Sequence, residues 1–343
     1  MVDIFMQYGL FLAKAVTIVV AVGTILILGV ALSRRRRPTE RLEVKSLNRK
    51  YEIMAQTMRR GVLSRKDYRK ESKTEKARKK AEKKRGTEKK KCIFVLHFRG
   101  DIKATAVASL REEVTAVLTT AAPKDEVLLC LENAGGLVHE HGLAASQLMR
   151  IKRKKVSLTI AVDKIAASGG YLMASVANRI IAAPFAVVGS IGVLAQLPNF
   201  HRLLERYGVG FEQIKAGEFK RTVTLFGKNT DKDREKLKQE IEDTHRLFKS
   251  FVAEQRPILD VTRAATGEHW YGARALDLKL VDDLMTTDDY LLAASTDADL
   301  YEVSYTARKR MGERMVSAVQ AALDRIFLAW HQTGGAAASE LRF

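Results

Sequence analysis

The chain has 343 residues, enough for one or two domains with a hydrophobic core of their own. Its net charge is +19, but 25 Lys and Arg against 8 Asp and Glu lie between residues 34 and 91, and all other residues carry 34 against 32. An enzyme that binds nucleic acid more often spreads basic groups over a folded face, so this distribution argues against a nucleic-acid partner. Cys92 and Cys130 lie in apolar runs, which favours buried free thiols and argues against a disulfide framework.

The first feature along the chain is an apolar run at residues 8–32, interrupted by Lys14. It is long enough to cross a bilayer with some tilt. No basic residue precedes it, no clear cleavage site follows it, and four arginines occupy 34–37. We therefore expect an uncleaved membrane anchor and not a signal peptide. The positive-inside rule would place the arginines, and the chain after them, in the cytoplasm.

A basic segment comes next. Scattered apolar residues between 42 and 86 recur at roughly helical spacing, which favours a juxtamembrane helix. Residues 72–91 are nearly all Lys, Arg, Glu, Thr and Ala, and they form either a solvated helix or a disordered stretch. Such a stretch either contacts anionic lipid headgroups or serves as a soluble spacer, and the sequence favours neither.

Predicted strands and helices alternate from residue 91 onward. Apolar runs predict strands at 92–98, 126–131 and 156–161, and apolar residues at helical spacing predict helices at 104–118 and 143–151. Alternation with helices of this length indicates βαβ units, and hence an α/β fold with a mostly parallel sheet.

Gly135 and Gly136 follow the second of these strands. Paired glycines at the carboxyl end of a parallel strand can leave backbone N–H groups free in a concave turn, which is either half of an oxyanion hole or an ordinary loop. His139 and His141 come directly after the turn. A His-x-His pair on a helix points poorly at one ion and no third ligand is evident, so we expect no metal site.

Ser168 follows the third strand and a short turn, and it is followed by Gly169, Gly170 and a helical pattern. A serine in this position has little side-chain bulk around it and backbone N–H groups beside it. Those are the requirements of an acyl-transfer nucleophile. The simpler interpretation is that Ser168 only caps the helix and that the glycines form a tight turn.

The apolar run at 180–197 is long enough for a second membrane span. Pro184, Gly189 and Gly192 within it favour strand–turn–strand packing inside the domain instead. We therefore expect a single span.

Four later segments complete the prediction. The last of them, a helix at 307–330, has one apolar face, which packs on the body, on a partner subunit or on the membrane. The segments are a short strand at 211–215, a long amphipathic helix at 231–251, a helix and turn at 267–284, and the final helix at 307–330.

Four motifs together resemble the signal peptide peptidase A (protease IV) family of membrane-bound serine–lysine peptidases. Their order is that of the family, the match spans residues 92–290, and the anchor and basic spacer are similar to those of short inner-membrane members. The motifs are NAGGLV at 133–138, DKIAASGGYLMAS at 163–175, VVGSIGVL at 187–194 and IKAGEFKRT at 214–222.

By that resemblance Ser168 is the nucleophile and Lys220 is the general base. Ser190 matches a serine that orients the lysine. The matching oxyanion-hole donors are the backbone N–H groups of Gly135, Gly136 and Gly169.

The resemblance has one departure. The family often has Ser-Pro-Gly-Gly, and here Asn133 and Ala134 precede the glycines. The missing proline loosens the turn but removes no N–H donor. Lys220 can act as a base if it is buried. A lysine with the ordinary pKa of ~10.4 is protonated at neutral pH, but burial among apolar groups favours its neutral form.

The resemblance also implies the wider properties of the protein. These are a crotonase/Clp-like fold, a homo-oligomer with active sites shared between subunits, no cofactor, and peptide substrates such as signal peptides or fragments of membrane proteins. The expected location is the bacterial inner membrane, in contact with lipid. Related catalytic domains lie outside the cytoplasm, opposite to what the arginines indicate, so the side of the membrane stays open.

Two other functions stay open. A crotonase-like acyl-CoA enzyme would need acidic catalytic groups, and only Asp163 lies near Ser168 in sequence. A catalytically silent membrane scaffold would not need both Ser168 and Lys220. The predicted parts are an anchor at 1–33, a basic juxtamembrane spacer at 34–91, a peptidase domain at 92–290 and a C-terminal helical extension at 291–343.

Overall fold

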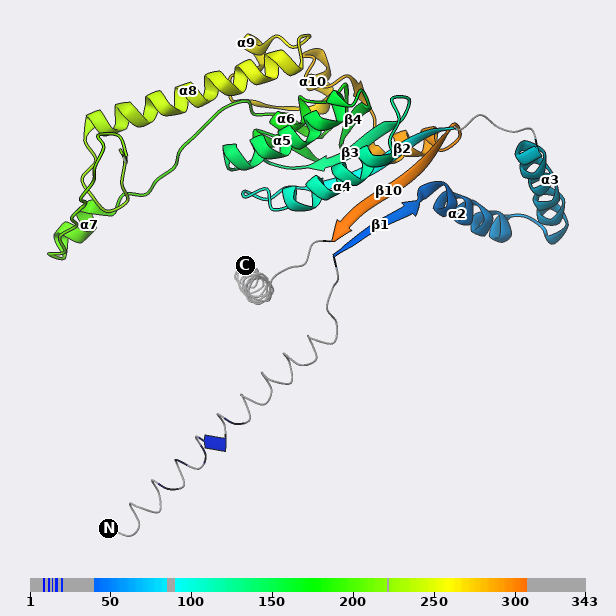
Figure 1. Ribbon diagram of the computed structural model, residues 1–343, viewed down its shortest axis with the longest axis horizontal. Coiled ribbons are helices and arrows are strands. Elements are labelled where there is room, and N and C mark those ends of the chain that lie inside the picture. The colour runs from blue at the N-terminus through cyan, green and yellow to red at the C-terminus, as the bar shows by residue number, and fades with distance from the viewer. Residues whose placement is uncertain are drawn as a thin grey trace, which may run out of the picture. The chain divides into compact units, whose positions relative to one another are not determined.

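A computed structural model of the chain describes residues 40–84, 90–220 and 222–306, and six single residues before them (9, 12, 14, 16, 17 and 20). Residues 42–305 form one compact unit, and Figure 1 labels many of its elements. The expected anchor at 8–32, those six residues aside, and the expected helix at 307–330 lie outside the described residues. Among the residues that are described, no helix is both long and apolar enough to cross a membrane.

The unit is built on a seven-stranded sheet. Its strand order is β1-β10-β2-β3-β4-β6-β9, and each neighbouring pair from β10 to β9 is parallel. This confirms the predicted α/β fold with a mostly parallel sheet. In that order the strands are Arg41–Ser46, Ala298–Thr306, Lys91–Arg99, Glu126–Glu132, Ser157–Val162, Arg179–Ala182 and Asp283–Leu284.

Both faces of this sheet are buried, because successive side chains of a strand point to opposite faces. In β3, Val127 and Leu129 belong to the larger core, which includes residues of α4, α5, α6 and α8. Leu128 belongs to the smaller core, which includes Leu47 of α2 and Leu291 of α11. Burial on both faces explains why the central strands are continuous apolar runs.

The helices confirm most of the sequence prediction. The expected helices at 104–118, 143–151 and 231–251 correspond to α4, α5 and α8, and the basic segment forms two helices, α2 and α3. The helices are α2 Leu47–Val62, α3 Arg65–Lys84, α4 Val107–Thr120, α5 Val138–Arg153, α6 Gly169–Ala174, α7 His201–Arg206, α8 Asp231–Gln255, α9 Val261–Ala264, α10 Gly272–Asp277 and α11 Thr287–Ala294.

Segments on both sides of the expected peptidase domain at 92–290 contribute strands to the main sheet. β1 comes from the expected spacer and β10 from the expected helical extension. Asn48, at the start of α2 and two residues after β1, bonds to β10: its Nδ2 donates to Ala298 O at 2.9 Å and its Oδ1 accepts from Leu300 N at 2.7 Å. Local periodicity could not show this, because it does not reveal which distant strand a segment pairs with.

The expectation of a strand at 211–215 is wrong. These residues are exposed, have no regular secondary structure, and lie in the long segment between α7 and α8 (Figure 1). A strand needs a hydrogen-bonded neighbour, and this segment runs away from both sheets.

A second, three-stranded sheet lies beside the first. It consists of β5 (Ile165–Ala167), β7 (Val187–Gly189) and β8 (His269–Tyr271), with β5 parallel and β8 antiparallel to β7. With β6, β7 gives the strand–turn–strand arrangement that was predicted for the run at 180–197. Ser168 follows β5 directly, and Ser190 follows β7 directly.

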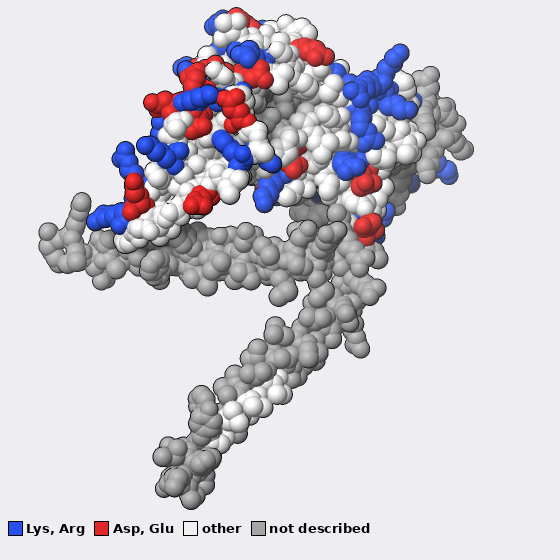
Figure 2. Space-filling view, turned by 60° about the vertical axis from the view of Figure 1, so that its left-hand side comes forward, with Lys and Arg blue, Asp and Glu red and all other residues white. Residues whose placement is uncertain are grey.

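The long helix α8 is joined to the body at its carboxyl end. Arg256, which follows it, is 4% exposed; its two terminal nitrogens donate to Asp282 at 2.8 and 3.1 Å, and its Nε donates to Lys279 O at 2.7 Å. Elsewhere along α8, acidic and basic side chains are interspersed, with exposed ion pairs such as Arg246–Asp243, and the face in Figure 2 shows both charges close together. Such exposed pairs contribute little to stability.

Candidate active site

Ser168 stands on a tight turn between β5 and α6. Its φ is 53° and its ψ is −120°, and its N–H donates to Gly189 O at 2.8 Å. A positive φ at a residue other than glycine is strained by roughly 1–3 kcal/mol and persists only where the surroundings impose it. Here the pairing of Ala167 with Gly189 imposes it.

Ser168 is not a helix cap in the usual sense. It occupies the N-cap position of α6, but its side chain makes no cap hydrogen bond. An N-cap serine normally accepts a bond from the second or third N–H of the helix. The simpler interpretation of this serine therefore has no support in the geometry.

The glycine turn after β3 touches Ser168. A Cβ built on Gly135, whose φ is +94°, would lie 2.7 Å from Ser168 Cβ and 2.9 Å from Gly169 N. The N–H of Gly135 donates to Asn133 Oδ1 at 2.8 Å, so this donor is engaged. Among the described residues no hydrogen bond is made by the N–H of Gly136 or Gly169, which leaves these two as candidate oxyanion donors.

Ser190 lies beside Ser168 by register. Ala167 pairs with Gly189 in a parallel ladder, so the next residue of each strand is one of these two serines. Ser190 has a φ of 52°, nearly the value of Ser168, and its N–H donates to Glu268 O at 2.7 Å. The structure therefore brings Ser168, Ser190 and the glycine turn together.

Lys220 is not among them. It lies in an exposed turn between α7 and α8, where its N–H donates to Gly217 O at 3.3 Å, and no hydrogen bond or ion pair joins it to Ser168 or Ser190. Phe219 is 50% exposed and its ring lies under the Lys236 ammonium at 4.9 Å. The described residues of one copy form no apolar pocket around Lys220, which is exposed.

Two residues near the turn were not assigned a role from the sequence. Asn133 and His141 are both buried, and His141 Nε2 lies 3.3 Å from Asn133 Oδ1. His139, in contrast, is exposed and lies 3.7 Å from Glu140, so the two histidines do not converge. An asparagine two residues before a glycine is a known turn signal, and it could have pointed to Asn133.

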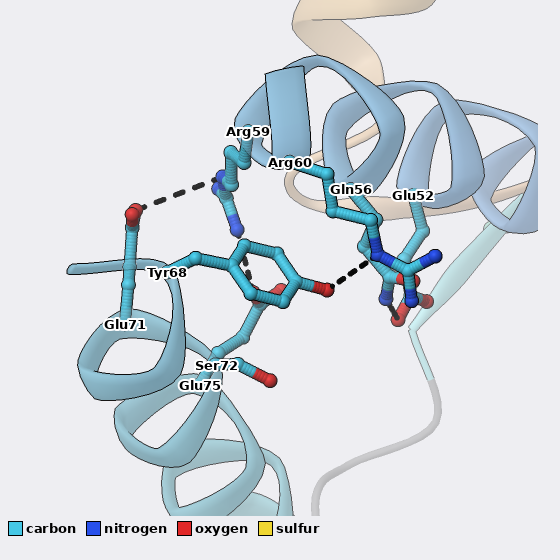
Figure 3. Close-up of a pocket in the computed structure, with 8 residues that line it drawn as sticks. All are labelled: Glu52, Gln56, Arg59, Arg60, Tyr68, Glu71, Ser72 and Glu75. Carbon is cyan, nitrogen blue, oxygen red and sulfur yellow. Dashed lines mark hydrogen bonds and ion pairs between the residues drawn. The ribbon is translucent and has the colours of Figure 1, made fainter. Parts of the chain in front are cut away.

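A small cavity lies elsewhere, between α2 and α3, with a volume of about 180 Å³ (Figure 3). Side chains that line it bond to one another: Arg59 reaches Glu75 at 2.6 Å and Glu71 at 3.6 Å, and Arg60 donates to Tyr68 Oη at 2.9 Å. These contacts hold the two helices together and leave no feature that indicates a ligand.

The two cysteines are not disulfide-bonded. Burial raises the pKa of the Cys130 thiol to about 12, so the reactive thiolate is scarce at neutral pH. Cys130 is therefore a poor nucleophile at neutral pH.

Comparison with known proteins assigns the family. "Peptidase family S49 N-terminal" matches residues 3–148, and "Peptidase family S49" matches residues 150–301. The "Probable protease SohB" of Haemophilus influenzae is 46% identical over 324 residues, which is 90% of this chain and 91% of that protein.

The chain belongs to peptidase family S49.

Membership of S49 makes this chain a protease and confirms the resemblance drawn from the four motifs. The SohB protein of Buchnera aphidicola subsp. Schlechtendalia chinensis, also named a probable protease, is 42% identical over 303 residues, 85% of this chain and 99% of that one. Among solved structures, a membrane-bound stomatin-specific protease gives a TM-score of 0.40 at 16% identity, covering 60% of this chain and 84% of that one. The S49 assignment rests on the sequence matches.

Proposed function

We propose that this S49 peptidase is a membrane-anchored serine endopeptidase of crotonase/Clp-like fold, in which Ser168 is the nucleophile and Lys220 the general base. The observation that carries the proposal is the backbone at Ser168. It has a strained φ of 53°, a hydroxyl without a cap bond, and Gly135 in contact with its Cβ. A nucleophile on a sharp strand-to-helix turn beside free N–H groups is suited to acyl transfer.

The chemistry follows from these positions. Neutral Lys220, oriented by Ser190, takes the hydroxyl proton as Ser168 Oγ attacks the peptide carbonyl carbon. The N–H groups of Gly136 and Gly169 donate to the oxygen that becomes negative. The lysine then gives the proton to the departing amine, which leaves an acyl-enzyme. Water, deprotonated by the same lysine, releases the acid and restores the serine.

The proposed site is completed by a second copy of the chain. Lys220 is exposed and separate from Ser168 in one copy, and the segment that carries it exposes many apolar side chains. Exposed apolar side chains concentrated in one segment support a subunit interface there, and burial of Lys220 in such an interface would favour its neutral amine. The exposed side chains include Leu194, Leu197, Leu203, Tyr207 and Ile214.

The proposed substrates are extended hydrophobic segments, such as signal peptides or fragments of membrane proteins. The same apolar surface supports this, because it would line the approach to each site in an oligomer. The proposed location is the bacterial inner membrane, with residues 8–32 as the single anchor. Protease accessibility in intact spheroplasts tests which side the domain occupies, since the arginines at 34–37 favour the cytoplasm and the family resemblance favours the outside.

The first test is cleavage of long, unstructured, leucine-rich peptides by the detergent-purified full chain. Ser168→Ala and Lys220→Ala should be inactive while folded, and Lys215→Ala, which changes another exposed lysine of the same loop, should be active. Cleavage by Lys220→Ala would show that the base is wrongly assigned. If the wild-type protein is inert, an acyl-CoA enzyme or a scaffold becomes the better hypothesis, and acyl-CoA binding separates those two.

The second test addresses the shared site. Ser168→Ala and Lys220→Ala subunits are dissociated, mixed in equal amounts and reassembled. If each site takes its serine and its lysine from neighbouring copies, about a quarter of the sites recover both groups, because the two neighbours are drawn at random. No recovery after mixing would place both groups in one copy.

A further inference from the structure

Asn133 shapes the glycine turn from within. Its side chain is buried, and its Oδ1 accepts the N–H of Gly135 at 2.8 Å. This is the pattern in which an asparagine side chain replaces a backbone acceptor in a tight turn. Because Ala134 does not fix its own φ as a proline would, the conformation of the turn depends on this bond.

The backbone of Asn133 is joined to the strand that carries Ser168. Its N–H donates to Ile165 O at 2.9 Å, and its carbonyl accepts from Ala167 N at 3.0 Å. Asn133 is therefore fixed by its main chain to β5, and its side chain holds the turn to the same place. Asn133 therefore sets how far the glycine turn lies from Ser168.

His141 holds the side chain of Asn133. The ring is fully buried at the start of α5, with Nε2 3.3 Å from Asn133 Oδ1 and Nδ1 2.9 Å from Leu137 O. Leu137 O and Asn133 Oδ1 can only accept hydrogen bonds. The bond from Gly135 N settles the orientation of the Asn133 amide, because it needs the oxygen and not the nitrogen on the side of the turn and the ring. The contact with Asn133 is therefore a hydrogen bond when Nε2 carries a proton.

The surrounding backbone fits closely around this pair. A Cβ on Gly169 would lie 2.5 Å from the His141 ring, and a Cβ on Gly100 would lie 2.4 Å from the Asn133 amide. The ring thus packs directly against the residue whose N–H is a candidate oxyanion donor. Neither side chain can turn aside without moving that backbone.

We infer that Asn133 and His141 are positioning residues that fix the Gly135–Gly136 turn, and with it the oxyanion donors, against Ser168. The functional half of this inference rests on the proposed function, because it assumes that the site performs acyl transfer. The two side chains touch no substrate. Their effect is on where the N–H groups of Gly136 and Gly169 lie when the carbonyl oxygen becomes negative.

The test uses a matched pair of variants at His141. In His141→Gln the side-chain nitrogen reaches the place of Nε2 and can still donate to Asn133 Oδ1. In His141→Asn the nitrogen reaches only the place of Nδ1 and can donate to Leu137 O, which leaves Asn133 unheld. Asn133→Ala removes the acceptor itself. Thermal unfolding of each full-length protein in detergent identifies any variant that does not fold.

The first readout is hydrogen–deuterium exchange of the Gly135 amide, followed by mass spectrometry with residue-level fragmentation. Exchange should accelerate about tenfold or more in Asn133→Ala and His141→Asn, since a lost bond worth about 1.4 kcal/mol changes an opening equilibrium tenfold. His141→Gln should keep the wild-type rate. Equal exchange in the two His141 variants, or wild-type exchange in Asn133→Ala, would overturn the inference.

The second readout is peptide cleavage. Removing an oxyanion donor outright costs about 10²–10³ in kcat, so displacing the donors should lower kcat by roughly tenfold or more in Asn133→Ala and His141→Asn. KM should stay within about twofold, because the loss falls on the transition state. Faster exchange with unchanged kcat would show that the pair fixes the turn without serving the reaction.

The failure of the proposed function has a different signature. It appears as absence of cleavage by the wild-type protein together with absence of Ser168 labelling by a fluorophosphonate. The exchange measurement needs no activity. In that case it still decides whether Asn133 and His141 hold the turn.

Discussion

Replacing Gly135 with alanine should disable the site by adding one methyl group. The new Cβ would lie 2.7 Å from Ser168 Cβ, 2.9 Å from Ala167 O and 2.9 Å from Gly169 N. Carbon atoms in contact normally lie about 3.5–4.0 Å apart, so each contact is too close. None of the three atoms is the end of a flexible side chain that could rotate away.

Two costs add at this position. The φ of +94° is strained for alanine by roughly 1–3 kcal/mol, and forcing a methyl group into filled space costs a further ~1–3 kcal/mol. The turn is partly exposed, so it should retreat from Ser168 and relieve part of this strain. Its retreat would carry the Gly136 N–H away from the oxyanion, which should lower kcat about 100-fold or more.

The assay compares Gly135→Ala with Gly142→Ala in peptide cleavage and thermal unfolding. Gly142 lies in α5, where a Cβ meets nothing within 4 Å. Alanine there should leave kcat unchanged and stabilise the helix by roughly 0.5–1 kcal/mol. A Gly135→Ala enzyme with kcat within about threefold of the wild type would refute the placement of the oxyanion donors beside Ser168.

Three further changes test the framework around the site. Arg256→Ala should lower the free energy of unfolding by about 3 kcal/mol, because it leaves Asp282 without its buried partner, whereas Arg246→Ala at an exposed pair should change little; similar thermal midpoints for the two variants would contradict this. Burial alone would raise the pKa of Glu126, but hydrogen bonds from Lys91, Thr159 and Tyr290 lower it below its ordinary value of 4.5. The stabilisation from ionised Glu126 is therefore complete above pH 4.5 and is lost as the pH falls through the lowered pKa. Glu126→Gln should flatten the acid side of a plot of thermal midpoint against pH. An unchanged plot would count against this role of Glu126. Cys130, with a pKa of about 12, should resist iodoacetamide at pH ~8 in the folded protein and react after unfolding; rapid alkylation in the native state, measured by mass spectrometry, would be inconsistent with its burial.

The central sheet could be predicted from the sequence because its strands are buried on both faces. Residues 127–131 of β3 are all apolar, so the strand can be recognised without an alternating pattern. β10 could not be found in this way: at 298–306 it mixes Asp, Glu, Ser and Thr with apolar residues, and nothing local reveals that it pairs with β2. Pairing between segments about 200 residues apart is a property of the folded chain and leaves no trace in a short window.

The site divides in the same way. Ser168 could be predicted because a strand, a serine and two glycines are adjacent in sequence, and this local pattern determines the sharp turn. The contact between Asn133 and His141 depends on where α5 begins, and the boundary of a helix is the least certain part of any sequence-based prediction. The His-x-His spacing of His139 and His141 can be read from the sequence, and it raised the question of a metal site. The contact of His141 with Asn133 cannot be read from the sequence.

The two strained serines have a common cause, and this explains why the site is built on the smaller sheet. β5 and β7 end at the same level, Ala167 pairs with Gly189, and both chains turn at the next residue, with φ of 53° at Ser168 and 52° at Ser190. The turn at Ser168 is held by its bond to Gly189 O, and the turn at Ser190 by its bond to Glu268 O of the segment that enters β8. Each strained residue is thus held by a bond to a neighbouring segment of the smaller sheet, and the pairing within that sheet offsets the backbone strain at both serines. In the proposed mechanism, that rigidity belongs to the serine half of the site, and the lysine half is free to arrive from another subunit.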